Sequence, residues 1–132
     1  MNLALLFSEP FNLPFFVAGL LSAAIWVIHT FMGGLAVVQP LLSAEFESVA
    51  KYTQYYCWHV VTIVLFAMAA AFVYSAFRSD ANDLGWAMTS LAGAFALWGL
   101  LLPPLVKHTY AQLPQGWLFI PVTVLGVWGL LT

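Results

Sequence analysis

Four long stretches of this 132-residue chain carry no charged side chain, and they constrain its fold more than any other feature. A helix that spans a membrane needs about 20 mostly apolar residues, so each stretch can supply one. A transmembrane barrel would alternate apolar and polar residues, whereas Val60–Val73 is apolar throughout except at Thr62. The sequence therefore predicts spanning helices within Pro10–Ala44, Tyr52–Phe77, Leu84–Val106 and His108–Thr132.

The overall composition agrees with this interpretation. The chain is 64% hydrophobic and 6% charged, whereas soluble domains carry about 25% charged residues. Three Lys and Arg residues are too few for a phosphate-binding face, which argues against a nucleic-acid partner. We therefore predict a single all-α domain, residues 1–132, that is integral to a membrane and has the lipid bilayer as its surroundings.

The boundaries of the helices follow from the prolines and the capping residues. We predict helices at about residues 15–38, 44–77, 84–102 and 117–131. Pro40 and Pro103-Pro104 are expected to end the first and third helices, because proline cannot continue the hydrogen-bond ladder. Ser43 is the expected N-cap of the second helix. The short connections predict an up-down four-helix transmembrane bundle with antiparallel neighbours.

Two histidines, His29 and His59, lie inside the first two apolar stretches. A polar group at bilayer depth is costly and must be paired with something. His29 precedes Gln39 by ten residues, about 15 Å of helix, and His59 follows Lys51 by eight, about 12 Å. Because the two helices run in opposite directions, both depths are measured from one membrane face. The sequence therefore predicts a polar site that contains both histidines.

Two tyrosines are expected to complete this site. Tyr55 and Tyr56 precede His59 by four and three residues, and Thr62 follows it by three, so all three share a helix face with it. His108 falls in the loop between the third and fourth helices, toward the same membrane face. We therefore select His29, His59, Tyr55 and Tyr56 as candidate cofactor-binding residues.

Several roles for the site remain open at this point. In the structural interpretation, each histidine forms a hydrogen bond across a helix interface, as polar side chains commonly do in membranes. In a metal site, His29 and His59 would be imidazole ligands of copper or zinc. The remaining metal ligands would come from His108, Glu45 or Cys57.

The two histidines also suit larger ligands. Haem b could take His29 and His59 as its axial ligands. Helices in contact are about 8–10 Å apart, however, and a porphyrin needs more room. Gly33-Gly34 either provides that room or indicates tight packing without haem. A quinone or a lipid headgroup could instead accept hydrogen bonds from histidine and tyrosine.

Other classes of function receive less support from the sequence. No carboxylate lies within a span, which argues against a carboxylate-driven proton antiporter. No Ser-His-Asp set, nucleotide-binding loop or Cys-x-x-Cys motif is present, so little indicates an enzyme. A small oligomeric transporter with a proton-linked histidine is less favoured. Cys57 is the single cysteine, so the chain cannot form an intrachain disulfide.

Three segments resemble a group of small four-helix bacterial membrane proteins that have no established activity. The segments are IHTFMGGLAVVQPLL (Ile28–Leu42), YYCWHVVT (Tyr55–Thr62) and LPQGWLF (Leu113–Phe119). The resemblance implies a location in the bacterial inner, or cytoplasmic, membrane. It implies no role for any individual residue.

Two functional hypotheses follow. The first is a small membrane protein whose His29/His59 site binds a metal, haem or quinone. The second is a structural or accessory subunit in which the histidines tie helices together. Four helices of this length enclose little of a pore, so under either hypothesis we expect a homo-oligomer or a subunit of a larger membrane complex.

Overall fold

The computed structural model describes residues 11–132, and this part of the chain forms four helices joined by short connections. The first helix is continuous through three segments, α2 (Leu13–Ile28), the π-helical η1 (His29–Val38) and α3 (Gln39–Ser43). It is followed by α4 (Ser48–Ala76), a 3₁₀ turn η2 (Ser79–Ala81), α5 (Asn82–Leu105) and α6 (Gln115–Leu131). The predicted all-helical fold is confirmed for the described residues.

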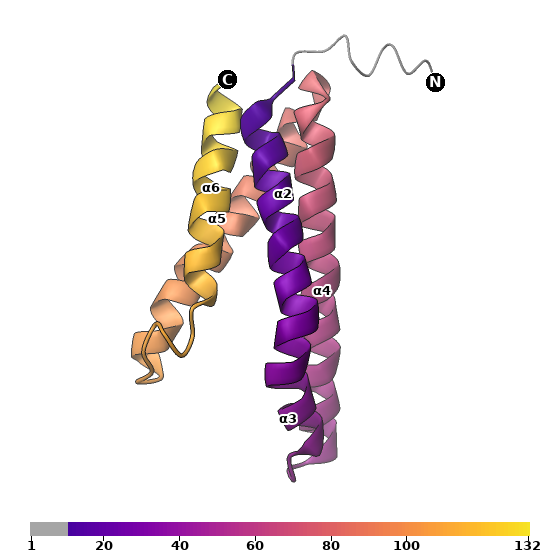
Figure 1. Ribbon diagram of the computed structural model, residues 1–132, viewed down its shortest axis with the longest axis vertical. Helices are drawn as coiled ribbons and strands as arrows, with labels where there is room; N and C mark the ends of the chain where they lie inside the picture. The colour runs from indigo at the N-terminus through magenta and orange to yellow at the C-terminus, as the bar shows by residue number, and fades with distance from the viewer. Residues whose placement is uncertain (1–10) are drawn as a thin grey trace, which may run out of the picture.

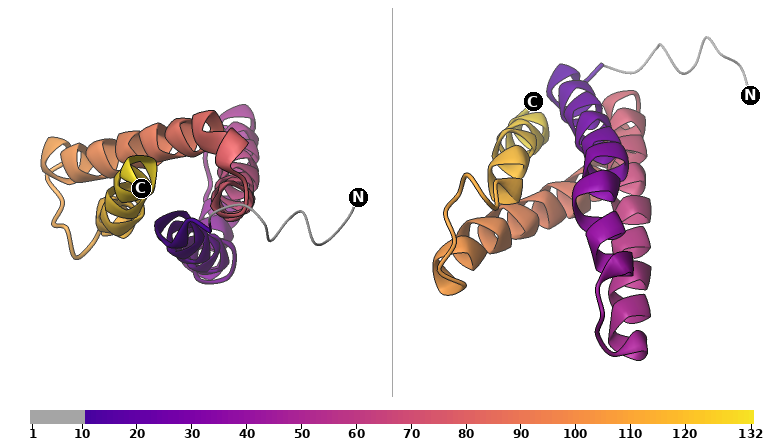
Figure 2. Two further views of the ribbon diagram at one scale, coloured as in Figure 1. Left: turned by 90° about the horizontal axis from the view of Figure 1, so that it is seen from above. Right: turned by 60° about the horizontal axis from the view of Figure 1, so that its bottom comes forward.

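The helices form two hairpins that meet at one end and diverge at the other (Figure 1). In the first hairpin α2, η1 and α3 lie beside α4, and in the second α5 lies beside α6. The hairpins meet through α2 with α6 and α4 with α5, near residue 11 and the C-terminus. Figure 2 shows that α5 then leads away from α4, so the far ends of the hairpins are separated.

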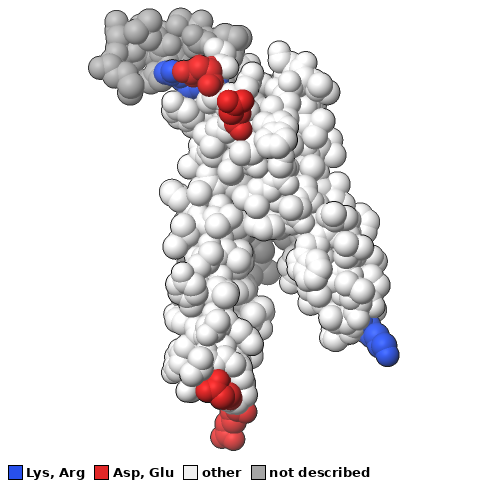
Figure 3. Space-filling model, turned by 180° about the vertical axis from the view of Figure 1, so that it is seen from behind, with Lys and Arg blue, Asp and Glu red and all other residues white. Residues whose placement is uncertain are grey.

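Within residues 11–132, three helical spans are long and apolar enough to cross a membrane. They are Leu13–Ser43, Ser48–Ala76 and Ser79–Leu105, whereas Gln115–Leu131 is shorter. Charged side chains gather at the ends of the molecule and leave the body between them uncharged (Figure 3). The end where the hairpins meet carries Arg78, Asp80 and Asp83, and the far ends carry Glu45, Glu47, Lys51 and Lys107.

The buried core lies where the hairpins meet. No residue of η1 is buried, and α4 has no buried residue before Leu65. The lower half of the first hairpin therefore consists of two helices without a third to cover them. The core residues are Phe15, Ala18, Ile25, Leu65, Met68, Phe72, Ala76, Ala92, Ala96, Phe119 and Val122.

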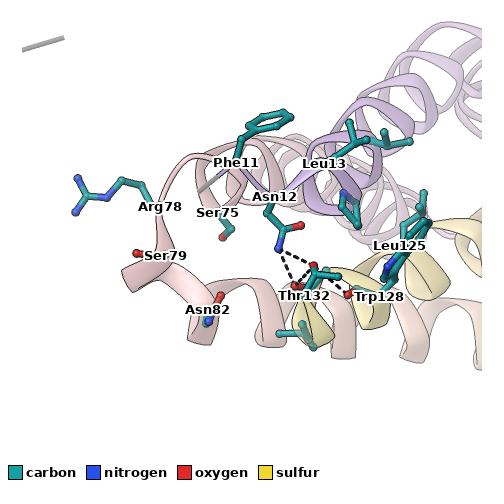
Figure 4. Close-up of a pocket in the computed structure, with 14 residues that line it drawn as sticks. Phe11, Asn12, Leu13, Ser75, Arg78, Ser79, Asn82, Leu125, Trp128 and Thr132 are labelled. Atoms are coloured by element: carbon teal, nitrogen blue, oxygen red, sulfur yellow. Dashed lines mark hydrogen bonds between the residues drawn. The ribbon is translucent and has the colours of Figure 1, made fainter. Parts of the chain in front are cut away.

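Asn12 connects three of the four helices at this closed end (Figure 4). Its Oδ1 accepts a hydrogen bond from the backbone N–H of Phe15 (3.0 Å), which caps the start of α2. Its Nδ2 donates to the carbonyl of Gly129 in α6 (2.7 Å). Its backbone N–H donates to the carbonyl of Ala76 at the end of α4 (2.9 Å). One residue therefore satisfies backbone groups at three helix ends.

Phe15 fills the space directly beneath Asn12. Its side chain is fully buried, and its ring centroid lies 5.9 Å from that of Phe72 in α4. A Cβ atom added to Gly85 or Gly129 would lie 2.5 Å from an atom of this ring. Glycine at both positions therefore allows α5 and α6 to close around the phenyl group.

The first helix continues past Pro40, which is a correction to the sequence-based prediction. Pro40 stands where the π-helical ladder, in which the Gln39 N–H bonds to the carbonyl of Gly34, returns to α-helix. The wider π turn displaces the carbonyl with which a proline ring would collide in a regular α-helix. The helix instead ends at Ser43, whose hydroxyl donates to the carbonyl of Gln39 (3.0 Å).

The third helix likewise passes through Pro103 and Pro104 and ends at Leu105. Pro104 has no N–H to offer the carbonyl of Leu100, and the hydroxyl of Tyr110 donates to that oxygen instead (3.1 Å). Both prolines lie in the last turn, where few further ladder bonds are lost.

The predicted N-cap of the second helix is also wrong. Glu47, not Ser43, caps α4, and its carboxylate accepts from the N–H groups of Ala50 (2.8 Å) and Val49 (3.0 Å). These two hydrogen bonds hold the pKa of Glu47 below its ordinary value. The cap is therefore fully present above the ordinary glutamate pKa and is lost as the pH falls through the lowered one.

Replacing Asn12 with aspartate separates its two side-chain roles. Asn12→Asp keeps the oxygen that caps α2 and removes the donor to Gly129. We expect the free energy of unfolding to fall by about 1–3 kcal/mol, the usual cost of leaving a buried acceptor unpaired. Denaturant titration in mixed micelles measures the change. Asn82→Asp, at an exposed position, is the matched control. Equal stability of the two variants would refute a stabilising hydrogen bond between Asn12 and Gly129.

Glycine at positions 99 and 116 allows α5 and α6 to approach each other closely. A Cβ atom on Gly99 would lie 2.5 Å from the Cα of Gly116, whereas one on Gly34 meets nothing within 4 Å. Gly99→Ala should therefore destabilise the second hairpin by about 1–3 kcal/mol through overpacking. Gly34→Ala should be neutral or stabilising by up to about 1 kcal/mol, because alanine favours helix. A larger loss in Gly34→Ala than in Gly99→Ala would contradict the packing.

Candidate functional site

His29 lies against Trp58 at the interface of the first hairpin. The imidazole and indole rings are stacked, with centroids 3.8 Å apart and planes inclined by 15°. A Cβ atom on Gly33 would lie 2.5 Å from Cη2 of the same indole. The absence of a side chain at Gly33 therefore leaves room for the indole of Trp58. We call His29, Trp58, Thr62 and Gly33 the histidine clasp.

Hydrogen bonds in the clasp define the protonated nitrogen of His29. Nε2 of His29 lies 3.1 Å from Oγ1 of Thr62 and 3.4 Å from the carbonyl oxygen of Trp58. The hydroxyl of Thr62 donates to that same carbonyl (3.0 Å), so its oxygen is free to accept. Because a carbonyl can only accept, the tautomer that satisfies both contacts has the proton on Nε2, which then donates across the interface. Nδ1 is then the ring nitrogen with a lone pair.

The backbone changes from α-helix to π-helix at His29. The π-helical segment η1 begins there and extends for ten residues. Such segments are rare, mostly a single turn long, and frequent at functional sites. Here the segment starts where the buried core ends, at the level where Trp58 is inserted against Gly33. The clasp therefore marks the transition from a packed four-helix region to an uncovered pair of helices.

His59 differs from His29 in both exposure and contacts. It is exposed, and its ring meets the edge of Tyr55, with centroids 4.6 Å apart and planes at 85°. Within residues 11–132 no hydrogen bond joins His59 to His29. The two histidines nevertheless lie at one level, because Trp58, the stacking partner of His29, precedes His59 directly. Tyr56 is also exposed and lies on the outer surface of α4.

The structure does not bring the three histidines together. His108 lies in the loop between α5 and α6, at the far end of the other hairpin, where its Nδ1 donates to the carbonyl of Val106 (2.9 Å). Among the described residues, no group of three His, Cys, Asp or Glu side chains could hold a metal ion, so Glu45 and Cys57 do not complete a site either. A cluster with His108 requires a closed bundle, whereas the hairpins diverge at this end.

The clasp restricts which ligands His29 could bind. Its Nε2 is engaged by Thr62 and Trp58, and one ring face is covered by the indole. A haem iron would therefore have to displace these contacts to reach Nε2. Nδ1 of His29 and the ring nitrogens of His59 are the positions from which a metal ion or a hydrogen-bonding ligand could be held. The hydroxyl of Tyr55 is a further donor beside His59.

Sequence reasoning did not identify Trp58 and Thr62 as the partners of His29. They are four residues apart and therefore occupy one face of α4, which is a signal readable in the sequence. Which residue on the first helix faces them depends on the register between two helices, and spacing along one helix does not specify that register.

Comparisons of the chain with protein-family models, with curated proteins and with solved structures found no match. The chemistry of its own residues is therefore the guide to its function.

The hydroxyl of Thr62 is the group whose removal tests the clasp. Thr62→Val keeps the shape and removes both the acceptor for His29 and the donor to Trp58. We expect the free energy of unfolding to fall by about 0.6–1.7 kcal/mol, the range for interhelical hydrogen bonds in membranes. Thermal unfolding in detergent measures this loss, and Thr62→Ser, which keeps a hydroxyl, should recover most of it. If valine and serine behave alike, Thr62 is not a hydrogen-bond partner of His29.

Proposed function

We propose that this chain is an integral protein of the bacterial inner membrane and acts as a structural or accessory subunit of a homo-oligomer or larger membrane complex. It would insert as an up-down bundle whose hairpins separate toward one face. The observation that carries the proposal is the engagement of His29 between two helices, where its ring is stacked and its Nε2 is hydrogen-bonded.

Helix lengths support insertion in the membrane. The hydrocarbon core is about 30 Å thick. His29 lies about 24 Å along the helix from Leu13, and His59 lies about 26 Å along α4 from Ala76, at 1.5 Å per residue. Both histidines would then lie just inside the far edge of the core. Tyr56 and Tyr52, about one and two turns beyond His59, would lie in the interface that tyrosine favours.

The depth of the clasp explains why a histidine would serve as a tie. Water is scarce at this level, so a polar side chain needs a partner within the protein. Below Ile25 and Leu65 no buried apolar residue holds α4 against the first helix. In this open half of the hairpin, the stacked rings and the hydrogen bond to Thr62 would hold the two helices together instead.

The exposed surface supports an accessory role. In an apolar 18-residue window of each of the three long spans, only 22–28% of the residues are buried within the chain. Large apolar side chains remain uncovered beside the clasp, and Gly34 leaves open space where a neighbouring helix could approach closely. Uncovered residues on the first hairpin include Phe31, Met32, Leu35, Ile63 and Phe66.

A second candidate function, ligand binding, is favoured by His59. Within the described chain the ring nitrogens of His59 form no hydrogen bond, although a polar group inside the bilayer requires a partner. A quinone oxygen needs one donor, which His59 or Tyr55 can provide. A copper or zinc ion would need ligands from a second chain in addition to His29 Nδ1 and His59, and haem b would need Trp58 to move. The metal ion and the haem would be retained through His59, and the quinone through His59 or Tyr55.

Purification from the native membrane in mild detergent distinguishes the two candidates. For the subunit function we expect co-purification of an assembly larger than one chain, without stoichiometric metal or haem. His29→Ala should then lower the free energy of unfolding by about 1–3 kcal/mol, because it leaves Thr62 and the Trp58 indole without their partner. His59→Ala is the matched control and should leave stability unchanged.

The ligand-binding function is tested on the same preparation by absorption spectra, elemental analysis and extraction of quinone. A metal, haem or quinone bound at one per chain and lost in His59→Ala would establish the ligand-binding function instead. A stable monomer that carries no ligand would contradict both.

A further inference from the structure

A cavity of about 430 Å³ lies at the closed end of the molecule, away from the histidine clasp. Its walls come from the start of α2, the connection between α4 and α5, and the last turns of α6 (Figure 4). Its volume falls within the range of about 300–1,000 Å³ that is usual for small-molecule sites. We call it the apex groove.

Two polar side chains of the groove, those of Asn12 and Ser75, are already paired with the protein. The amide of Asn12 donates to the carbonyl of Gly129, and the hydroxyl of Ser75 donates to the carbonyl of Ala81 (3.2 Å). The remaining inner surface is apolar and includes Val17 and Leu125. A polar solute would find few free hydrogen-bonding groups there, whereas a hydrocarbon chain would replace water on apolar walls.

The groove becomes more polar toward the end of the molecule. Asn82 and Thr132 are exposed at its rim, and Trp128 forms part of its wall. Leu125 lies seven residues from Thr132 along α6, about 10 Å deeper. The groove therefore extends from the level of the charged residues into the apolar span, and it matches a molecule with a polar head and an apolar chain.

Charges near the rim select among polar heads. Arg78 is paired with Asp80, with Nε to Oδ1 at 2.9 Å and NH2 to Oδ2 at 2.6 Å. Of these charged residues only Arg78 lines the groove, and Asp83 is exposed in the first turn of α5, next to Asn82 at the rim. Together Arg78, Asp80 and Asp83 carry one net negative charge. An anionic head would be repelled by it, whereas the ammonium of a zwitterionic head is attracted to carboxylates.

We propose that the apex groove binds one zwitterionic phospholipid with an ammonium headgroup, such as phosphatidylethanolamine. One acyl chain lies between Val17 and Leu125, and the headgroup lies beside Asn82 and Asp83. The proposal rests on membrane insertion, which is part of the proposed function, but it is independent of the clasp. Occupancy would brace the three helix ends that Asn12 joins.

Native mass spectrometry of the full chain in mild detergent tests this site. Delipidated protein is mixed with phosphatidylethanolamine or with phosphatidylglycerol at equal concentration. We expect one phosphatidylethanolamine per chain to persist at collision energies that remove nonspecific lipid, with at least fivefold less phosphatidylglycerol. Asp83→Asn should reduce this preference at least twofold.

Matched substitutions on α6 place the lipid in the groove. Leu125→Trp fills the groove and should reduce binding at least fivefold. Val124→Trp is the control, because Val124 is next to Leu125 in the sequence but is exposed and does not line the groove. Val17→Trp fills the groove from the opposite wall and should show the same loss, so misfolding of one variant leaves the test intact.

Three results would overturn the proposal. They are absence of a retained lipid in the wild-type protein, equal retention of the two lipids, and unchanged binding in the groove-filling variants. Assembly state is recorded in the same spectra. A lipid-free oligomer refutes only the groove, and a lipid-bound monomer refutes only the subunit function.

Discussion

Asn12 makes the interaction on which the arrangement of the two hairpins depends. Within a helix the backbone satisfies its own polar groups, so unsatisfied groups occur only at the ends. Asn12 forms hydrogen bonds with backbone groups at three helix ends. It caps α2, donates to the carbonyl of Gly129 in α6 and donates through its backbone N–H to the carbonyl of Ala76 in α4. Phe15 fills the space beneath it, against glycines of α5 and α6. The hairpins are therefore joined at this end through paired backbone groups and close packing.

Away from this end, the first hairpin depends on a different kind of contact. The buried core stops at Ile25 and Leu65, and the π-helical segment begins at His29. There a stacked ring pair and one hydrogen bond to Thr62 replace the apolar packing. A costly polar residue in an apolar helix is thus explained by its position, since it connects two helices that have no other buried contact below it. This is why we favour a tie over a ligand for His29.

Apolar stretches free of charge were enough to predict four helices, because helix length in a membrane is set by the hydrocarbon thickness. The equal depth of His29 and His59 also followed from helical rise. The continuation through Pro40 could not be predicted, because it depends on a local change from π- to α-helix. The separation of His108 from the other histidines depends on how the hairpins diverge, and Trp58 as partner of His29 depends on the register between helices. Asn12 before Pro14 resembles an N-cap in sequence, but its bond to Gly129 is a contact across the whole chain.

Nitrogen-15 NMR of histidine-labelled protein in lipid bilayers reports which ring nitrogen of His29 carries the proton, so it tests whether this imidazole ties the two helices together. We expect a neutral His29 with the proton on Nε2, and we expect Thr62→Val to shift this resonance while that of His59 stays in place. A His29 whose Nε2 lacks a proton, or whose spectrum is unaffected by Thr62→Val, would rule out this role, because the imidazole would then not be the donor that ties the two helices.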